Sequence, residues 1–150
     1  MILGPKLRRV YLDADSVHFT VVPTRDLELV FIQTEGNCDV NIMLKPESDA
    51  KFDVKIYIYA EGTSSVNCVC TLDVGKDVSG VETDIQIRSW PFDRSKIKAR
   101  PEMFIRNNNI IATHGNAIGS LKPEDKYYLE SRGLTNYKEL VKQSLIYNDA

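Results

Sequence analysis

Residues 53–60 of the sequence read Asp-Val-Lys-Ile-Tyr-Ile-Tyr-Ala, and this stretch decides the fold class. Its even positions are Val, Ile, Ile and Ala, whereas polar and aromatic side chains occupy the odd positions. Successive side chains of a strand point to opposite faces of a sheet, so this period of two predicts a strand with one buried face. The Gly-Thr-Ser-Ser stretch that follows at residues 62–65 is typical of a turn.

The same alternation recurs on both sides of this stretch. We predict about eight short strands, the others at residues 17–22, 27–33, 40–44, 66–74, 81–87, 103–106 and 110–114. This pattern is typical of a sandwich, a barrel or a parallel β-helix, and periodicity alone does not choose among the three. The sequence lacks the Asn-Gly and Asp-Gly pairs of tight hairpins, which slightly favours the β-helix.

The composition predicts one globular domain. The chain has 150 residues and a net charge of −2, which offers no basic field for nucleic acid or for an anionic membrane. No apolar run approaches the roughly 20 residues that cross a bilayer, and the first residues lack the apolar core of a signal peptide. We therefore expect a cytoplasmic protein without membrane or nucleic-acid partners.

The end of the chain changes character and predicts helices. Pro123 suits the first turn of one helix, Gly133 suits the residue after its end, and Thr135 can cap a second helix. In the second helix the apolar side chains recur at helical spacing, so one face must pack on the β part or on a partner. We thus divide the chain into a β core over residues 1–118 and a helical segment over residues 119–150.

The three cysteines are predicted to be structural. Cys68 and Cys70 stand two apart in a strand, beside apolar residues of the same face, and Cys38 fits the same pattern in another strand. Apolar surroundings raise the pKa of a thiol and leave it inert. The count is odd and no C-x-x-C pair is present, so we expect neither disulfides nor a zinc site of that kind, although iron or zinc ligation stays a minor alternative.

The sequence predicts different positions for the two histidines. His18 alternates with apolar neighbours and should face solvent. His114 should lie where the last strand ends, before a turn of small residues, which suits an accessible side chain. A hydrogen-bonded turn histidine and a functional histidine both stay open for this position.

Familiar catalytic motifs are absent from the sequence, including the G-x-S-x-G elbow, H-E-x-x-H and the phosphate-binding glycine loops. Tyr57, Tyr59 and Trp90, which we expect to be exposed, suit either the stacking platform of a carbohydrate-binding module or the cover of a sheet or dimer contact. A hydrolase or lyase is a third reading, which requires several carboxylates to converge in one groove.

Three ordered blocks in the last third of the chain resemble the SufB/SufD (SufBD) family, the scaffold components of iron–sulfur cluster assembly. The blocks are residues 99–105 (ARPEMFI), 110–119 (IIATHGNAIG) and 127–134 (YYLESRGL). The family pattern runs roughly R-P-x-L-x-I, then H-G-A-x-x-G, then Y-L-x-S-R-G-[IL]. A weaker similarity in the strand pattern extends back to about residue 50.

The resemblance implies a right-handed parallel β-helix followed by helices. It also implies a non-enzymatic subunit that pairs through its last β-helix strands, as a homodimer or with a SufB-type partner. For that edge we name Phe104, Ile105, Ile111 and Thr113.

The resemblance further implies that the C-terminal helices bind an ABC-type ATPase, SufC. The candidate residues for this contact are Tyr137, Leu140, Val141 and Leu145. No cofactor is expected to be required for folding, but a transient iron–sulfur cluster is implied, with His114 as the cluster-related residue and the only candidate metal ligand.

The chain also departs from the family pattern. It is far shorter than usual members, Ala112 stands where the SufD branch carries a cysteine, and no thiol lies near residues 88–91, where SufB carries one. The Thr-His-Gly stretch around His114 resembles the SufD branch. These departures favour an accessory, SufD-like subunit over a self-sufficient scaffold. Tyr128, Arg132 and Gly133 of the third block are expected to serve helix docking.

Overall fold

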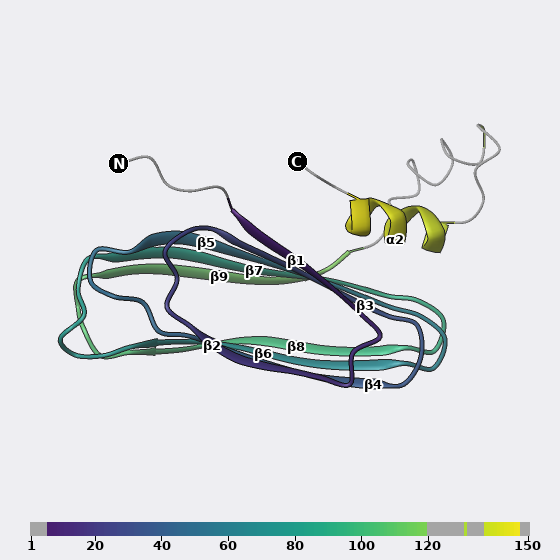
Figure 1. Ribbon diagram of the computed structural model, residues 1–150, viewed down its shortest axis with the longest axis horizontal. Coiled ribbons are helices and arrows are strands. Elements are labelled where there is room, and N and C mark those ends of the chain that lie inside the picture. The colour runs from purple at the N-terminus through teal and green to yellow at the C-terminus, as the bar shows by residue number, and fades with distance from the viewer. Residues whose placement is uncertain (1–5, 120–130, 132–136, 148–150) are drawn as a thin grey trace.

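The computed structural model describes residues 6–119, 131 and 137–147, and within them the chain forms a parallel β-solenoid with one helix (Figure 1). The elements are β1 (Leu7–Leu12), β2 (Ser16–Val21), β3 (Leu27–Gln33), β4 (Asn37–Leu44), β5 (Lys51–Ala60), β6 (Ser65–Val74), β7 (Val81–Pro91), β8 (Lys96–Ile105), β9 (Ile110–Ile118) and α2 (Tyr137–Tyr147). The predicted β-helix class is thus confirmed. The helix predicted to begin at Pro123, with Tyr128, Arg132 and Gly133, lies outside the described residues.

Odd-numbered and even-numbered strands form two separate sheets. One sheet has the order β1-β3-β5-β7-β9 and the other has the order β2-β4-β6-β8, with every pair parallel. The chain therefore alternates between the sheets and advances by one strand in each at every turn. Figure 1 shows the two layers facing each other.

The core fills the space between the two sheets. Each strand points alternate side chains inward, and the parallel register stacks them in columns such as Leu29, Ile56 and Ile87. The alternation that predicted the strand at residues 53–60 therefore also predicts which side chains are buried there, because Val54, Ile56, Ile58 and Ala60 are all inaccessible.

The turns between sheets need residues with a positive φ. Gly80 has φ +77° just before β7, and a side chain there would collide with the carboxylate of Asp49. Glycine adopts this conformation without steric cost, which explains the residue at this turn.

Two strands were wholly or largely missed by the sequence prediction. β1 was not predicted because Arg8 and Arg9 interrupt its alternation, and β8 was predicted only over residues 103–106. In β8 the outward positions carry Lys96, Lys98 and Arg100, and Pro101 follows, so the sequence resembles a loop. Proline and charged side chains are nevertheless typical of edge strands, which is where β8 lies.

Helix α2 packs on the outer face of the sheet that contains β3. Val141, Leu145 and Ile146 join a second apolar cluster with Val30, Ile32 and Tyr59. No helix among the described residues is both long enough and apolar enough to cross a bilayer.

Candidate functional site: the open last strand pair

The last strands of the solenoid, β8 and β9, each leave one edge without a partner. Within the described residues β8 pairs only with β6, and β9 only with β7. Each therefore presents a row of unpaired backbone N–H and C=O groups, which is a template for another strand. The two edges lie at the same end of the solenoid (Figure 1).

The inward side chains of these two strands form an incomplete layer, which we call the C-terminal opening. Its members are Ile97, Ala99, Pro101, Met103 and Ile105 of β8 with Ile110, Ala112, His114, Asn116 and Ile118 of β9. They continue the buried columns beneath them, but none of them is buried. The core thus ends in a partly apolar surface instead of a closed layer.

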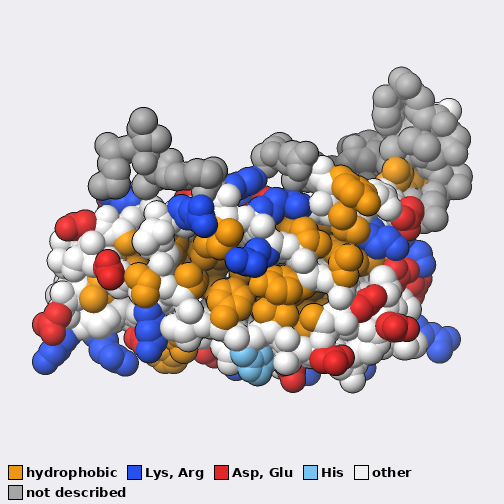
Figure 2. Space-filling view, in the orientation of Figure 1, with side chains coloured by type: hydrophobic (Ala, Val, Ile, Leu, Met, Phe, Trp, Pro, Cys, Tyr) orange, Lys and Arg blue, Asp and Glu red, His pale blue; other side chains and the backbone are white. Residues whose placement is uncertain are grey.

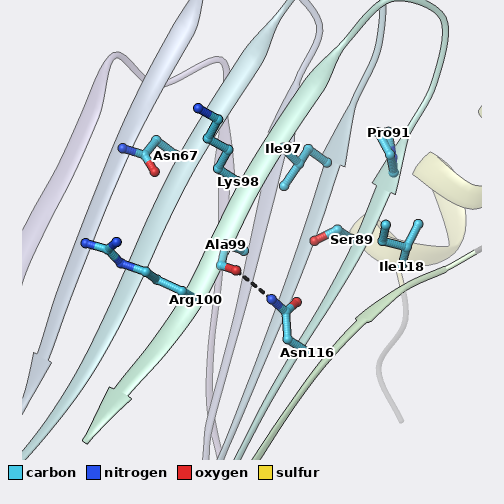
Figure 3. Close-up of a pocket in the computed structure, with 9 residues that line it drawn as sticks. All are labelled: Asn67, Ser89, Pro91, Ile97, Lys98, Ala99, Arg100, Asn116 and Ile118. Atoms are coloured by element: carbon cyan, nitrogen blue, oxygen red, sulfur yellow. Dashed lines mark hydrogen bonds between the residues drawn. The ribbon is translucent and has the colours of Figure 1, made fainter.

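A hollow of about 420 Å³ lies in this opening, between β8 and the end of β9 (Figure 3). Asn116 reaches across it, and its Nδ2 donates a hydrogen bond of 2.5 Å to the carbonyl oxygen of Ala99. Ile97 and Ile118 supply apolar walls, while Lys98 and Arg100 lie at its rim. The hollow therefore combines an apolar interior with a basic border.

His114 lies within β9 and not at its end, so the predicted position at the strand terminus is wrong. β9 continues for four residues beyond it, to Ile118. His114 is in register with the buried Ile85 and therefore belongs to the inward face, yet it is exposed, because no strand of the described part of the chain covers it. His114 is therefore not a turn residue, and its imidazole is exposed on the last layer of the solenoid.

No cluster of metal-ligating side chains surrounds His114 among the described residues. Those residues contain no group of three or more His, Cys, Asp or Glu side chains that could hold a metal ion. The cysteines are excluded by burial: Cys38, Cys68 and Cys70 are all buried in the core and free, as predicted.

The predicted edge residues all lie on the last two strands but face different ways. The exposed fractions of Phe104, Ile105 and Ile111 are 53%, 39% and 64%. Ile105 belongs to the inward set, whereas Phe104 and Ile111 face outward. Ile118, 76% exposed, was missed, although its even position in the β9 alternation could have identified it.

Thr113 faces outward and ties β9 to β7. Its hydroxyl donates a hydrogen bond of 2.6 Å to Oδ1 of Asp84, and Gln86 Nε2 donates another of 2.9 Å. These two hydrogen bonds, the one from Thr113 first, hold the pKa of Asp84 below its ordinary value. Thr113 thus helps to hold the edge strand in place.

The four ATPase candidates on α2 divide between two faces of the helix. Leu145 is buried and Val141 half-buried against the sheet, whereas Leu140 is exposed and Tyr137 half-buried. Leu140, Gln143, Ser144 and Tyr147 form an exposed stripe at helical spacing. Any partner of the docked helix therefore meets this stripe.

Charged groups hold α2 on the solenoid at both ends. Lys138 Nζ lies 3.0 Å from Asp93 Oδ2, and Lys142 Nζ lies 3.4 Å from Glu61 Oε1. At the other end Arg8 donates hydrogen bonds to the carbonyl oxygens of Leu145 and Ile146 and pairs with Glu28 at 2.8 Å. A guanidinium at the C-terminal end of a helix also complements its dipole.

The aromatic residues proposed as a sugar-stacking platform are not exposed as predicted. Tyr59 is completely buried in the cluster beneath α2, and Tyr57 and Trp90 are half-buried and pack against that cluster. The reason is the helix, which covers this part of the sheet. Tyr57, Tyr59 and Trp90 thus lie in the contact between the outer face of the sheet and α2, which agrees with the alternative that they help to cover a sheet.

Several carboxylates do line one groove of about 430 Å³ on the outer face of the odd-numbered strands. They are Asp26, Asp53, Glu82 and Asp84. Asp26 accepts a hydrogen bond from the backbone N–H of Asp53, and Asp84 is held ionised by Thr113 and Gln86. With its lowered pKa, Asp84 is a poor general acid near neutral pH, so it is not the raised carboxyl that hydrolysis of a glycoside requires.

A comparison with models of known protein families identifies a match that covers more than half of the chain. The family model described as "SUF system FeS cluster assembly, SufBD core domain" matches residues 44–139, from the end of β4 into α2. No curated protein matches the chain. The matched range contains the whole C-terminal opening and the first turn of α2.

Proposed function

The chain belongs to the SufBD family, and from this premise we propose that it is a non-enzymatic subunit of iron–sulfur cluster assembly that pairs through β8 and β9 and binds an ABC-type ATPase through α2. Family membership supports the role in cluster assembly. The observation that carries the pairing is the C-terminal opening, in which an unfinished core layer meets two unpaired strand edges.

Pairing through this opening would complete the core. A strand from a second subunit can bond the free edge of β9 while apolar side chains cover Ile97, Met103 and Ile110. A second copy and a SufB-type subunit both present such an edge. The basic row of Lys96, Lys98 and Arg100 on β8 favours a partner with acidic groups opposite it.

A positive charge introduced on the free edge strand β9 tests the proposed pairing. Ile111→Lys places a cation on the exposed edge strand and should raise the dissociation constant of the pair at least tenfold, measured by analytical ultracentrifugation. Asn41→Lys is the matched control, because Asn41 is equally outward and exposed but lies on β4 inside its sheet. Unchanged association of the Ile111 variant, for the homodimer and for the SufB-type pair alike, would refute pairing through β9.

The ATPase would bind the exposed stripe of α2, with Leu140 and Tyr147 as apolar anchors. Val141 and Leu145 hold the helix on the sheet and thus act indirectly. A pull-down with a SufC-type ATPase should lose at least tenfold in bound ATPase with Leu140→Glu, whereas Thr63→Glu, at an exposed turn, should bind normally. Full retention by the Leu140 variant would remove α2 as the docking site.

Iron and sulfide are the cargo of the proposed assembly, and His114 is the residue that faces them. Its imidazole can ligate iron from the open layer, with the remaining ligands supplied by the partner. Anaerobic reconstitution of the paired complex should give a visible absorption band that His114→Ala weakens and His18→Ala leaves intact. Equal bands in both variants would exclude His114 as a ligand.

A further inference from the structure

The described element that follows β9 leaves the C-terminal opening uncovered. Helix α2 packs instead on the outer face of the odd-numbered strands, against Val30, Ile32 and Tyr59. Figure 2, in the orientation of Figure 1, shows hydrophobic side chains between the two sheets and charged side chains mostly around them. A second copy that continues the core across the opening must therefore place its two sheets in line with these two.

Only two arrangements of a closed pair keep both sheets continuous. A closed pair of identical subunits has a two-fold axis, and here that axis is perpendicular to the solenoid axis, so every new strand pair is antiparallel. In self-pairing, β9 bonds to β9 and β8 bonds to β8. In crossed pairing, β9 of each copy bonds to β8 of the other, which is the strand of the opposite sheet.

The structure fixes the register of crossed pairing. Its two-fold axis runs along the strands, so each residue keeps its level along the strand direction. The hydrogen bond from Asn116 Nδ2 to the carbonyl oxygen of Ala99 places these two residues opposite each other across the core. Because β8 and β9 run in opposite directions, Ile111 then lies at the level of Phe104. Crossed pairing therefore sets Ile111 of one copy beside Phe104 of the other.

The backbone groups of the two edges fit this register. The N–H of Lys96 bonds on the β6 side and that of Gly119 on the β7 side, so the outward residues direct their backbone groups into their own sheets. These groups alternate along a strand, so the inward residues present theirs to the free edges, apart from the N–H that Pro101 lacks. Crossed pairing sets inward residues against inward residues, such as Ile110 against Ile105, and the free groups thus face each other.

The outward side chains favour crossed pairing over self-pairing. Phe104 and Ile111 are 53% and 64% exposed, and crossed pairing packs them together as a cross-strand pair. Self-pairing of β8 would instead set the basic row beside its own copy, and like charges on neighbouring strands are destabilising. In crossed pairing the basic row lies opposite the small residues Gly115 and Ala117 of β9.

We propose that the partner at the C-terminal opening is a second copy of this chain and that the strands cross, with β9 of each copy bonded to β8 of the other. This inference rests on the pairing proposed above. It goes further by naming the partner, the strand pairs and their register.

Disulfide formation between two variants that each add one cysteine tests the crossing. Outward residues that oppose each other here have Cα atoms about 4.5 Å apart, which is within the range of a disulfide. A mixture of Phe104→Cys and Ile111→Cys under mild oxidation should therefore give at least tenfold more disulfide-linked dimer than either variant alone. The three native cysteines are buried and do not compete.

A mixture of Ile111→Cys and Ala117→Cys is the matched control, because these positions meet when β9 pairs with its own copy over all nine residues. It should give no more linked dimer than the single variants. Analytical ultracentrifugation of the reduced mixtures sets the concentration at which they are dimeric, and circular dichroism verifies that each variant is folded.

The outcomes separate this inference from the pairing on which it rests. Dimers in which the Phe104 and Ile111 variants do not link, or in which the control mixture links instead, would overturn the crossing and leave the pairing intact. A wild-type chain that stays monomeric at every concentration would overturn the second copy as partner. The proposed pairing would then have to be made with a SufB-type subunit.

Discussion

Cys68 and Cys70 illustrate how the face of a strand determines the chemistry of a residue. Both point into the core, where each is inaccessible to solvent. Burial, with a smaller contribution from the neighbouring thiols at Cys68, raises the pKa of both residues to about 12. Alternation in the sequence sufficed to predict this, because two residues that are two apart in a strand share a face.

The cysteines should consequently be unreactive in the folded protein. With a pKa near 12, the thiolate fraction at pH 8 is about 10⁻⁴, and thiolate is the reactive form. Ellman's reagent should detect no rapidly reacting thiol from Cys68 or Cys70 in buffer and all three thiols in guanidinium chloride. A rapid reaction of either residue in buffer would contradict their burial.

Asp84 has the opposite behaviour, because its pKa is lowered. A carboxyl with a lowered folded pKa stabilises the fold above its unfolded pKa of about 3.8, and this contribution is lost as the pH falls through the folded value. Thr113→Val removes the larger of the two hydrogen-bond contributions. We expect the Asp84 pKa, followed by NMR, to rise towards its ordinary value in this variant.

The stability of the Thr113 variant should therefore depend less on pH between about 5 and 2 than that of the wild type. The effect on the free energy of unfolding should be below about 1 kcal/mol at pH 7, because Asp84 lies near the surface. An unaltered Asp84 titration would show that the hydrogen bond from Thr113 does not form in solution.

At the scale of elements, helix α2 explains most of what sequence patterns could not predict. The spacing of Leu140, Ser144 and Tyr147 in the sequence indicates a helix, but it does not say which stripe packs on the sheet. The structure buries the neighbouring stripe with Val141 and Leu145, since these side chains meet Val30, Ile32 and Tyr59. Tyr59 was misassigned for the same reason, because a long-range contact covers it.

Alternation in the sequence predicted the strands correctly only where the inward positions are apolar. Arg9 breaks that rule in β1, and the basic outward positions of β8 obscure it there. Both strands lie at ends of the solenoid, where inward side chains are not buried. His114 was placed too near the strand end for a related reason: Gly115 and Asn116 are typical of turns, but the pairing with β7 keeps them in β9.

Arg8 should hold α2 in place, and the fluorescence of Trp90, the single tryptophan of the chain, can show whether the helix stays docked. Trp90 packs against the cluster beneath α2. Arg8→Gln removes the bonds to the end of the helix and leaves Glu28 with Lys6 as its remaining cation. We expect a red shift of Trp90 emission and a loss of about 1–3 kcal/mol in unfolding free energy.

Arg106→Gln serves as a charge-matched control for the Arg8 variant, because Arg106 follows β8 of the other sheet and pairs with Asp73. The far-ultraviolet β signal should be unchanged in both. If Arg8→Gln lost stability without any change in Trp90 emission, Arg8 would stabilise β1 and not the docking of α2.

At the scale of the whole molecule, stability should vary along the solenoid axis. In a solenoid each layer contacts only its neighbours, so central layers gain from two interfaces and end layers from one. Ile56 lies in a central layer and is inaccessible, whereas Ile118 lies in the last layer and is mostly exposed.

Ile56→Ala should therefore cost about 3–4 kcal/mol in urea unfolding, whereas Ile118→Ala should cost less than about 1 kcal/mol in the unpaired chain. In the paired complex the cost at Ile118 should increase, because the partner would bury it. Equal costs at the two positions in the unpaired chain would contradict an open last layer.

More of the fold than of the candidate site could be predicted from the sequence. Eight of the strand positions and the β-helix class follow from alternation and from the resemblance of the last third of the chain. The C-terminal opening does not follow from either, since it depends on which strands lie last in each sheet. Such an arrangement becomes visible only when the parallel columns are followed from Arg9 to Asn116.

The contact of α2 with Arg8 ties the last described element of the chain to the first. A pulling force applied to the two ends of the polypeptide would thus act on the contact between Arg8 and α2 before it acted on any layer of the solenoid. The helix would detach at low force, because its few bonds are pulled open one after another. The layers would then peel away sequentially from both ends, in steps whose lengths measure one coil each.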